Sequence, residues 1–404
     1  MSTSLLYHGF GIRGYRYVRT EYIEGGVVFT IEQNPTTHRC PICGGKDTIL
    51  KGGVVRRFRG LPIGSRKVTI VFRVPRIKCR DCKAVRQTPI AFADPRRSYT
   101  QSFAQYVLEL ARMMTIRDVA LHLGVSWDVV KEIVKHDLQK RFSRPKLKDV
   151  RQIAIDEISI GKGHRYLTLV LDLESGAVVH VGQGKGGDAL KAFWTRLGRG
   201  RAKIEAVAID MSPAYIQAVL THLPQATLVF DRFHVIKLYN QKLSDLRRTL
   251  YHTIQEGLEK KALKGVRWLL LKRPENLEPT RREPQRLQEA LRLNEPLAIA
   301  YYLKEELSEI WEQEDQETAQ ALLMDWITFA ESTGIRMLHD FAKTLRLHAW
   351  GILAYYDHPI STGPLEGTNN KIKTMKRQAY GFRDQEFLRL KILAIHESKY
   401  ALVG

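Results

Sequence analysis

Four cysteines in two CxxC pairs place the strongest constraint on how this chain folds. Cys40 and Cys43 form the first CxxC motif, and Cys79 and Cys82 form the second. Two strand-like segments lie between the pairs, VVRRFRG and KVTIVFRVPRIK, joined by a turn at LPIGS. Because four thiolates complete a tetrahedral Zn²⁺ site, we expect a β-rich domain closed by one structural zinc ion. A disulfide arrangement needs an oxidising compartment, which nothing here indicates. We expect His38 to be a surface residue rather than a ligand.

The charge of the chain indicates a polyanionic partner. The 404 residues carry 64 Lys and Arg against 43 Asp and Glu, a formal net charge of +21. Residues 1–150 hold 28 of these cations and 12 of these anions, so most of the excess lies in the first third. No apolar run long enough for a membrane span occurs, and the first residues lack the pattern of a secretion signal. We therefore expect a cytoplasmic protein that binds nucleic acid and no membrane.

Residues 99–142 have a helical period. SFAQYVLELARMM reads as an amphipathic helix, and TIRDVALHLGVSWDVVKEIVKHDL has the spacing of a helix-turn-helix. Ala120 is the small residue at the helix crossing, and Gly124 permits a left-handed turn. Inward contacts are expected from Val119, Leu123, Val125, Val130 and Ile133. The second helix should begin near Trp127, and the residues expected to face a DNA major groove are Ser126, Trp127, Asp128, Lys131 and Lys135. The alternative is a helical hairpin within a core.

After a linker at residues 143–149 the pattern turns to strands. VRQIAIDEISI, YLTLVLDLESGAVVHVG, IEAVAIDM and ATLVFDRFHV read as strands, and DALKAFWTRLG and SPAYIQAVLTHL as helices. Three strands in a row followed by alternating helix and strand predict a mixed five-stranded sheet with helices packed on it.

Two of these strands deliver a carboxylate from the apolar core, Asp156 in AIDEISI and Asp210 in VAIDM. If the strands are neighbours, the two carboxylates lie close together and resist joint ionisation unless a cation sits between them. Mg²⁺ and Mn²⁺ prefer such oxygen ligands. For Asp210 the alternative is a helix cap before Ser212. Glu157 follows Asp156 directly, so strand alternation points it to the opposite face.

An acidic residue, Glu366, stands at the head of a basic helix in PLEGTNNKIKTMKR. Pro364 suits the first turn of a helix. A core-facing stripe follows at the spacing of three and four residues, formed by Leu365, Thr368, Ile372, Met375 and Ala379. Glu366 lies beside this stripe, and a row of expected phosphate binders follows it on the same face, Asn369, Asn370, Lys373 and Arg377. This arrangement suits a third metal ligand beside a DNA backbone.

Together these motifs resemble the DDE transposases of bacterial insertion sequences. The resemblance lies in AIDEISI, VAIDMSPAY, DRFHVIK and PLEGTNNKIK, and the order of the domains resembles the ISL3 family in particular. It implies a ribonuclease-H-like core in which Asp156, Asp210 and Glu366 hold two Mg²⁺ or Mn²⁺ ions. Asp231 and His234 resemble a D-x-x-H element, which has either an auxiliary role or that of a structural hydrogen-bonded pair.

The resemblance also implies an activity. We expect a transposase that binds double-stranded DNA at terminal inverted repeats, cleaves the ends by metal-dependent phosphodiester hydrolysis and joins 3′ ends to target DNA. It would act as a homodimer or higher homo-oligomer on DNA of the bacterial nucleoid. The alternatives are a DNA-binding repressor with an inactive ribonuclease-H-like domain and a stand-alone two-metal nuclease.

The chain is thus expected to be multidomain, with α+β and α/β parts. The expected segments are a zinc-binding domain at 1–95, a helix-turn-helix domain at 96–148, the first part of the catalytic core at 149–234, an all-helical insertion at 235–353 and the last core helices at 354–404.

Overall fold

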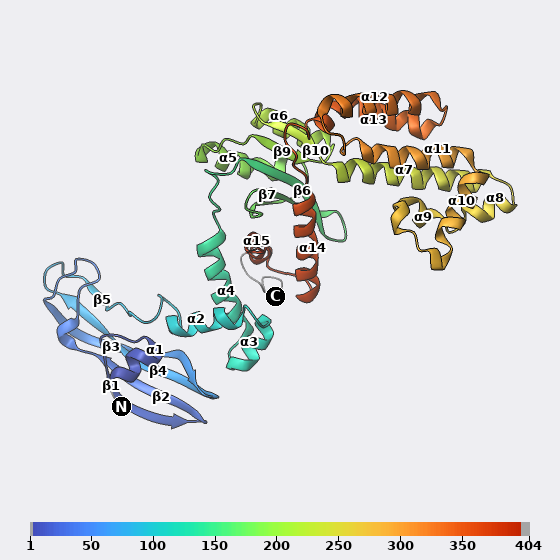
Figure 1. Ribbon diagram of the computed structural model, residues 1–404. Helices are drawn as coiled ribbons and strands as arrows, with labels where there is room; N and C mark the ends of the chain where they lie inside the picture. Colours follow the sequence, from blue (N-terminus) through green and yellow to red (C-terminus); the bar gives the residue numbers. More distant parts are fainter. Residues whose placement is uncertain (1–2, 397–404) are drawn as a thin grey trace. The chain divides into compact units, whose positions relative to one another are not determined.

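The computed structural model describes residues 3–396 (Figure 1). The chain divides into two compact units. The first comprises residues 1–143 and 374–404, and the second comprises residues 144–373. None of the helices in the described residues is long and apolar enough to cross a lipid bilayer.

The first unit contains a five-stranded sheet that follows a short helix, α1 (Thr3–Phe10). Its strands are β1 (Tyr15–Ile23), β2 (Gly26–Gln33), β3 (Thr48–Ile63), β4 (Arg66–Cys79) and β5 (Val85–Gln87), with a 3₁₀ turn η1 (Pro35–Thr37) between β2 and β3. The order is β1-β2-β4-β3, with β5 paired to β4. Phe92 fills the core, with edge-on ring contacts to Tyr15, Phe58 and Phe72. The β-rich fold expected for this region is thus present.

The sheet brings the two cysteine pairs together. Cys79 ends β4 and pairs in register with Thr48, just after the first knuckle. The Sγ atoms of Cys40 and Cys82 lie 3.6 Å apart, as do those of Cys43 and Cys79, and all four cysteines are free thiols. Thiolates at about 2.3 Å around a tetrahedral Zn²⁺ would be separated by ~3.8 Å. The four residues therefore fit a structural zinc ion.

The backbone favours the thiolate form at Cys40. Backbone amides of Cys43 and Ile42 donate to the Cys40 sulfur and lower the pKa of Cys40 to about 7. The expected surface position of His38 is wrong. Its side chain is buried, and this burial lowers the pKa of the imidazole.

Three helices follow, α2 (Gln101–Leu110), α3 (Ile116–Leu123) and α4 (Trp127–Phe142). Gly124 ends α3 with φ 60°, the left-handed cap expected there, and the Ser126 hydroxyl accepts the Val129 amide at 3.3 Å to begin α4. The expected inward residues are buried, except Val125, which is half-buried. A further helix, α15 (Gln385–Leu393), packs Phe387 and Leu390 into the same cluster. The sequence instead predicts that α15 belongs with the catalytic core; its apolar face is buried against α4.

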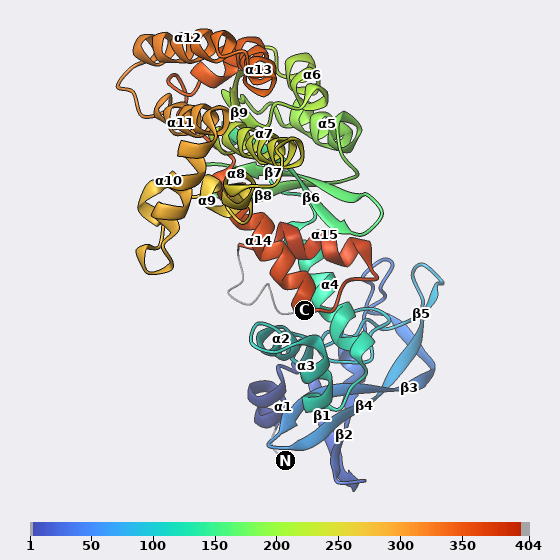
Figure 2. The same cartoon turned by 90° about the vertical axis from the view of Figure 1, so that its right-hand side faces the viewer.

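The second unit is built on the predicted mixed five-stranded sheet (Figure 2). Its strands are β6 (Gln152–Gly161), β7 (Arg165–Asp172), β8 (Val178–Gln183), β9 (Ala206–Ile209) and β10 (Thr227–Phe230), in the order β10-β9-β6-β7-β8. The first three are antiparallel neighbours, and β9 and β10 run parallel to β6. The elements between β8 and β10 are η2 (Gly187–Leu190), α5 (Lys191–Gly200) and α6 (Pro213–His222). This arrangement is consistent with a ribonuclease-H-like fold.

The expected helical insertion follows β10. It consists of α7 (Arg232–Thr253), α8 (Leu258–Leu263), α9 (Arg267–Leu271), η3 (Pro274–Asn276), η4 (Pro279–Arg281), α10 (Glu283–Leu293), α11 (Glu295–Glu309), α12 (Gln316–Ser332) and α13 (Arg336–Leu353). In Figure 1, α12 and α13 form an antiparallel pair, and α11 lies along α7. One continuous apolar cluster joins these helices to the sheet. The chain then forms α14 (Gly363–Gln378), which carries Glu366.

We expect Cys79→Ser to lose the zinc ion and to loosen the first sheet, because the remaining thiolates cannot close a tetrahedral site. Elemental analysis should give about one zinc per chain for the unchanged protein and far less for the variant, with faster proteolysis of residues 1–95. Ile42→Ser is the matched control, since it alters the exposed centre of a knuckle and keeps all four thiols. Unchanged protein purified without chelator that contains no zinc would contradict this prediction.

Candidate active site

Three aspartates lie in a row across three neighbouring strands of the second sheet, near the carboxyl ends of β9 and β10. This end of the sheet is called the edge below. Ala154 of β6 pairs with Ala208 of β9, which in turn pairs with Val229 of β10. Continuing this parallel register by two residues on each strand aligns Asp156, Asp210 and Asp231. The apolar residues before each aspartate are buried; β9 and β10 end just before Asp210 and Asp231, whereas β6 continues past Asp156. The predicted proximity of Asp156 and Asp210 follows from this register.

Asp156 lies at one end of the row, on β6, with Asp210 between it and Asp231. Its Oδ2 accepts a hydrogen bond of 2.8 Å from Nδ2 of Asn369 on α14, and its Oδ1 lies 3.9 Å from Nε2 of His234. Burial raises the pKa of Asp156 above its ordinary value. The charge of Asp210 raises it further, whereas His234 opposes the shift. Burial and the nearby charge of Asp210 thus outweigh the groups that favour the charged form of the Asp156 carboxyl.

The carboxylate of Asp210 has a local partner as well. Its Oδ1 accepts the backbone N–H of Ser212 at 3.0 Å, just before α6. This bond spans two residues of a turn, and the N-cap of α6 is Ser212, so Asp210 does not cap the helix; the turn uses one oxygen of its carboxylate. Glu157, the neighbour of Asp156 along β6, is engaged elsewhere, since it accepts the hydroxyl of Tyr215 at 2.7 Å.

Asp231 and His234 form a hydrogen-bonded pair. Asp231 is 1% exposed, and its Oδ2 lies 3.1 Å from Nδ1 of His234. Its other oxygen accepts the backbone N–H of Thr362 at 3.0 Å, in the segment that leads into α14. Although burial alone raises the pKa of Asp231, the bonds from His234 and Thr362 hold it below its usual value. For His234 burial has the opposite effect and lowers the pKa of the imidazole. The neighbouring carboxylates of Asp231 and Asp156 outweigh this effect, so the pKa of His234 is raised overall. Asp231 thus orients the imidazole toward Asp156 and fixes the approach to α14.

Glu366 lies on the first turn of α14. Its backbone N–H donates to the Thr362 carbonyl at 2.9 Å, and its side chain is exposed. The predicted apolar stripe of α14 is buried at Leu365, Thr368, Ile372 and Met375. Among the described residues, only the four cysteines bring three or more candidate ligand atoms within 4.8 Å of one another. The structure therefore pairs the two aspartates by register but does not draw the Glu366 carboxylate into a closed ligand set with them.

Asn369 has a role that the sequence did not reveal. Its position one turn after Glu366 suggested a phosphate contact, but the side chain is 5% exposed and bonds Asp156 instead. Its Oδ1 is buried with no hydrogen-bond partner in the described structure. In the sequence, only the position of Asn369 next to the buried stripe of α14 could have indicated that its side chain is buried. Asn370, Lys373 and Arg377 are exposed, as a surface that binds phosphates requires.

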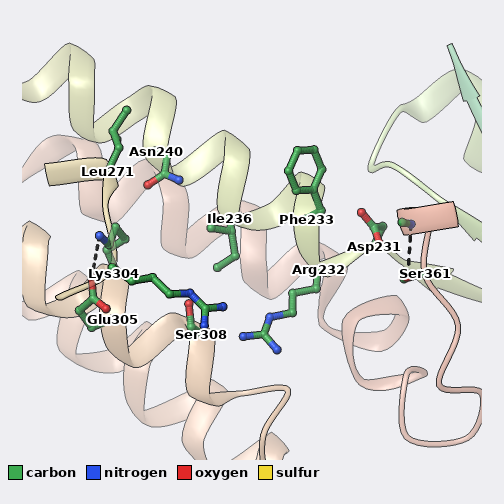
Figure 3. Close-up of a pocket in the computed structure, with 12 residues that line it drawn as sticks. Asp231, Arg232, Phe233, Ile236, Asn240, Leu271, Lys304, Glu305, Ser308 and Ser361 are labelled. Atoms are coloured by element: carbon green, nitrogen blue, oxygen red, sulfur yellow. Dashed lines mark hydrogen bonds and ion pairs between the residues drawn. The ribbon is translucent and has the colours of Figure 1, made fainter. Parts of the chain in front are cut away.

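A hollow of about 350 Å³ adjoins Asp231 on the side of the insertion (Figure 3). Arg232 and Ser361 border it near the aspartate, and Lys304 lies at its far end. The cations are already engaged: Arg232 pairs with Glu312 at 2.9 Å, and Lys304 donates to two backbone carbonyls and pairs with Glu305. Arg232 and Lys304 therefore stabilise the protein around this hollow and are not available to bind an anionic ligand.

The helix-turn-helix presents a different surface from the one predicted. Lys131 and Lys135 are only 17% and 23% exposed, because Asp384 at the start of α15 pairs with both, at 2.9 Å and 2.8 Å. These contacts hold the pKa of Asp384 well below its usual value despite an opposing effect of burial. Trp127 remains exposed, whereas Ser126 uses its hydroxyl as a helix cap. The exposed positions of α4 include Asp128, which was predicted to face the groove, and Glu132 and His136, which were not.

Comparison with known proteins agrees with this architecture. A model of the ISL3 transposase family matches residues 153–392, one of the helix-turn-helix domain of ISL3 transposases matches residues 87–138, and one of the zinc finger of transposases IS204/IS1001/IS1096/IS1165 matches residues 36–82.

Whole sequences match as well. The transposase for insertion sequence element IS1001 from Bordetella parapertussis is 35% identical, over 95% of this chain and 96% of its own. The transposase for insertion sequence element IS1557 from Mycobacterium tuberculosis is 30% identical, over 91% of this chain and 87% of its own. Among solved structures, the Drosophila P element transposase strand transfer complex is similar with a TM-score of 0.40 and 10% sequence identity. The match covers 74% of this chain and 92% of that chain. With the cysteine cluster, the helix-turn-helix and the aspartate row in place, the chain belongs to the ISL3 family of transposases.

Proposed function

We propose that this transposase cuts the ends of its element and joins them to target DNA at the edge of the second sheet, where Asp156 and Asp210 meet α14. The observation that carries the proposal is the junction itself. Asn369 bonds Asp156, and Thr362 bonds Asp231, so the helix that bears Glu366 is attached to the row of aspartates at two points. Thr362 lies just before α14 and Asn369 lies in its second turn, so these two bonds hold the first turn, with Glu366, close to the aspartates.

The donor set fits a hard divalent cation. Asp156 and Asp210 would hold Mg²⁺ or Mn²⁺, with Glu366 as the third ligand, since these ions prefer carboxylate oxygens. The raised pKa of Asp156 supports this assignment, because a bound cation would offset both the burial and the repulsion from Asp210. When bound, two such ions supply Lewis-acid stabilisation of a scissile phosphate and align the attacking and leaving oxygens.

The chain's own residues would prepare the site. Asp231 fixes the tautomer and the direction of His234, whose Nε2 then faces Asp156. Asn369 restrains the Asp156 carboxylate from the opposite element. Lys373 and Arg377, exposed farther along α14, would contact the phosphates on either side of the cleaved bond. No Tyr or Ser motif indicates a covalent intermediate, so hydrolysis and joining would share this one site.

The first unit would recognise the terminal inverted repeats through its helix-turn-helix. In the structure Asp384 occupies the two lysines expected to bind phosphates, so this carboxylate competes with DNA for the same cations. DNA that displaces Asp384 would have to exchange one set of ion pairs for another. Affinity for the ends therefore depends on α15 as well as on α4.

We expect Asp384→Asn to tighten DNA binding and to steepen its dependence on salt. Asparagine can still cap α15 by accepting the Phe387 amide, but it no longer neutralises Lys131 and Lys135. Two freed lysines would increase the slope of log K against log salt by up to about 2. Glu386→Gln is the matched control, since it removes one negative charge from the same helix but keeps the ion pairs of Asp384 with both lysines. Equal affinities and slopes for the two variants would rule out the competition.

We expect Asp156→Asn or Asp210→Asn to abolish cleavage while the protein still binds element ends. Each change keeps the shape of the side chain and removes a charged oxygen donor from the site. Losing a metal ligand should slow cleavage by about a thousandfold or more. A nicking assay in Mg²⁺ on labelled ends measures this, with Asp188→Asn, an exposed aspartate elsewhere in the unit, as control. A variant that nicks its ends at the normal rate would remove that residue from the catalytic set.

We expect Glu366→Gln to abolish both cleavage and strand transfer. A pre-cut DNA end bypasses the hydrolytic step, so joining of this end to plasmid DNA tests the shared site directly and also separates a transposase from a stand-alone nuclease. Glu157→Gln is the control, because glutamine can still accept the Tyr215 hydroxyl. Normal joining by Glu366→Gln would show that α14 is only structural.

A further inference from the structure

A large hollow in the first unit has no role in the function described so far. It measures about 1040 Å³ and lies between the helix-turn-helix and the turn that joins α14 to α15. Arg117, Trp127 and Lys131 line it from the helix-turn-helix, and Tyr380, Arg383 and Asp384 line it from the turn. Its size is at the upper end of the range of ligand-binding pockets.

The turn presents an aromatic ring to solvent. Tyr380 is 100% exposed, on a backbone with φ 49°, and Gly381 follows with φ 97°. Phe382 anchors the turn, because its ring lies 6.0 Å from that of Phe387, which is buried in the helical cluster. The ring of Tyr380 is therefore fully available to a partner that enters the hollow.

Trp127 provides a second aromatic surface. It is 47% exposed at the start of α4, and the Nζ of Lys131 lies 5.5 Å from the centre of its ring. Lys131 is in turn held by Asp384, so the indole, the ammonium group and the carboxylate form one connected wall. The hollow therefore has flat apolar surfaces whose positions are set by neighbouring charges.

The remaining charge of the hollow is positive. Lys131 and Lys135 together offset Asp384. Arg117 and Arg383 are exposed, and within residues 3–396 no ion pair joins either of them to a carboxylate. Two available guanidinium groups beside two aromatic faces match the two chemical parts of a nucleotide, a planar base and an anionic phosphate.

We propose that this hollow binds an unpaired nucleotide of DNA, with the base stacked on Tyr380, with Trp127 lining the same hollow, and with the adjacent phosphates held by Arg117 and Arg383. The proposal rests on the DNA-binding role proposed for the first unit and adds a site that the helix-turn-helix alone does not provide. A paired base shows only its edges in the grooves, whereas an unpaired base exposes the face that an aromatic ring can cover. The site would tolerate any sequence, because every base has such a face.

The test compares single-stranded with duplex DNA. Full-length protein is titrated into a labelled eight-nucleotide oligo-dT and, separately, into a short duplex at the same salt concentration, with anisotropy as the readout. Tyr380→Ala should weaken binding of the single strand by about 5- to 150-fold, the worth of one base–aromatic stack. Tyr380→Phe should bind normally, and the duplex should bind Tyr380→Ala within about twofold of the unchanged protein.

Tyr22→Ala is the matched control, because Tyr22 is another exposed tyrosine of the same unit, at 72% exposure, away from the hollow. It should bind both probes normally. Oligo-dT should also quench tryptophan fluorescence in the unchanged protein and much less in Trp127→Phe. Melting temperatures of all variants confirm folding, which a change at a fully exposed position should not disturb.

Two results would overturn the proposal. One is equal binding of oligo-dT by Tyr380→Ala and the unchanged protein. The other is an equal loss of duplex and single-strand binding, which would make Tyr380 a general DNA contact. Neither outcome bears on the catalytic edge, whose proposed role fails only if the Asp156, Asp210 or Glu366 variants remain active. The two proposals can therefore fail separately.

Discussion

The buried carboxylate of Asp231 is the interaction on which the arrangement of the catalytic edge depends. It follows β10, caps α7 and accepts the backbone N–H of Thr362, 131 residues later in the chain. An unpaired buried carboxylate is costly, so its hydrogen bonds to His234 and Thr362 are needed for the fold as well as for the site. Through this one group the sheet, the insertion and α14 share a fixed point. The helix that carries Glu366 could not otherwise be positioned by a sheet that ends so much earlier in the sequence.

The insertion must leave and return at the same edge, and its packing enforces this. Phe230 at the end of β10 contacts the rings of His348 and Trp350 on α13, at 5.2 Å and 5.0 Å between ring centres. Gly351 lies against the same phenyl ring, where a Cβ atom would come within 2.4 Å of it. A side chain at Gly351 would push α13 away from β10. The last helix of the insertion is thus held beside the strand from which the insertion departs, and the segment to α14 can be short.

Local patterns made much of this structure predictable, and long-range pairing accounts for what they missed. Strand alternation and parallel register were enough to align Asp156 with Asp210, and the spacing around Gly124 was enough for the helix-turn-helix. No local pattern relates Asp384 to Lys135, which lies 249 residues before it. Asn369 was visible as a polar residue on a helix, but its bond to Asp156 depends on how α14 meets the sheet. His38 was misplaced because its burial depends on the tertiary packing of a loop.

The distribution of charge explains why binding and chemistry occupy different units. A DNA backbone is drawn to the cationic first third of the chain, whereas the row of aspartates would repel phosphate; burial, and to a lesser extent the charge of Asp210, raises the pKa of Asp156. DNA held by the first unit would therefore gain nothing by approaching the row until cations reverse its sign. With the metal site proposed above, we expect such a separation to leave DNA binding independent of the metal and to make cleavage dependent on it. Within the first unit, a carboxylate likewise controls access to cations. Asp384 pairs with two lysines, and an anion with several closely spaced charges, such as the phosphates of DNA, is needed to replace it.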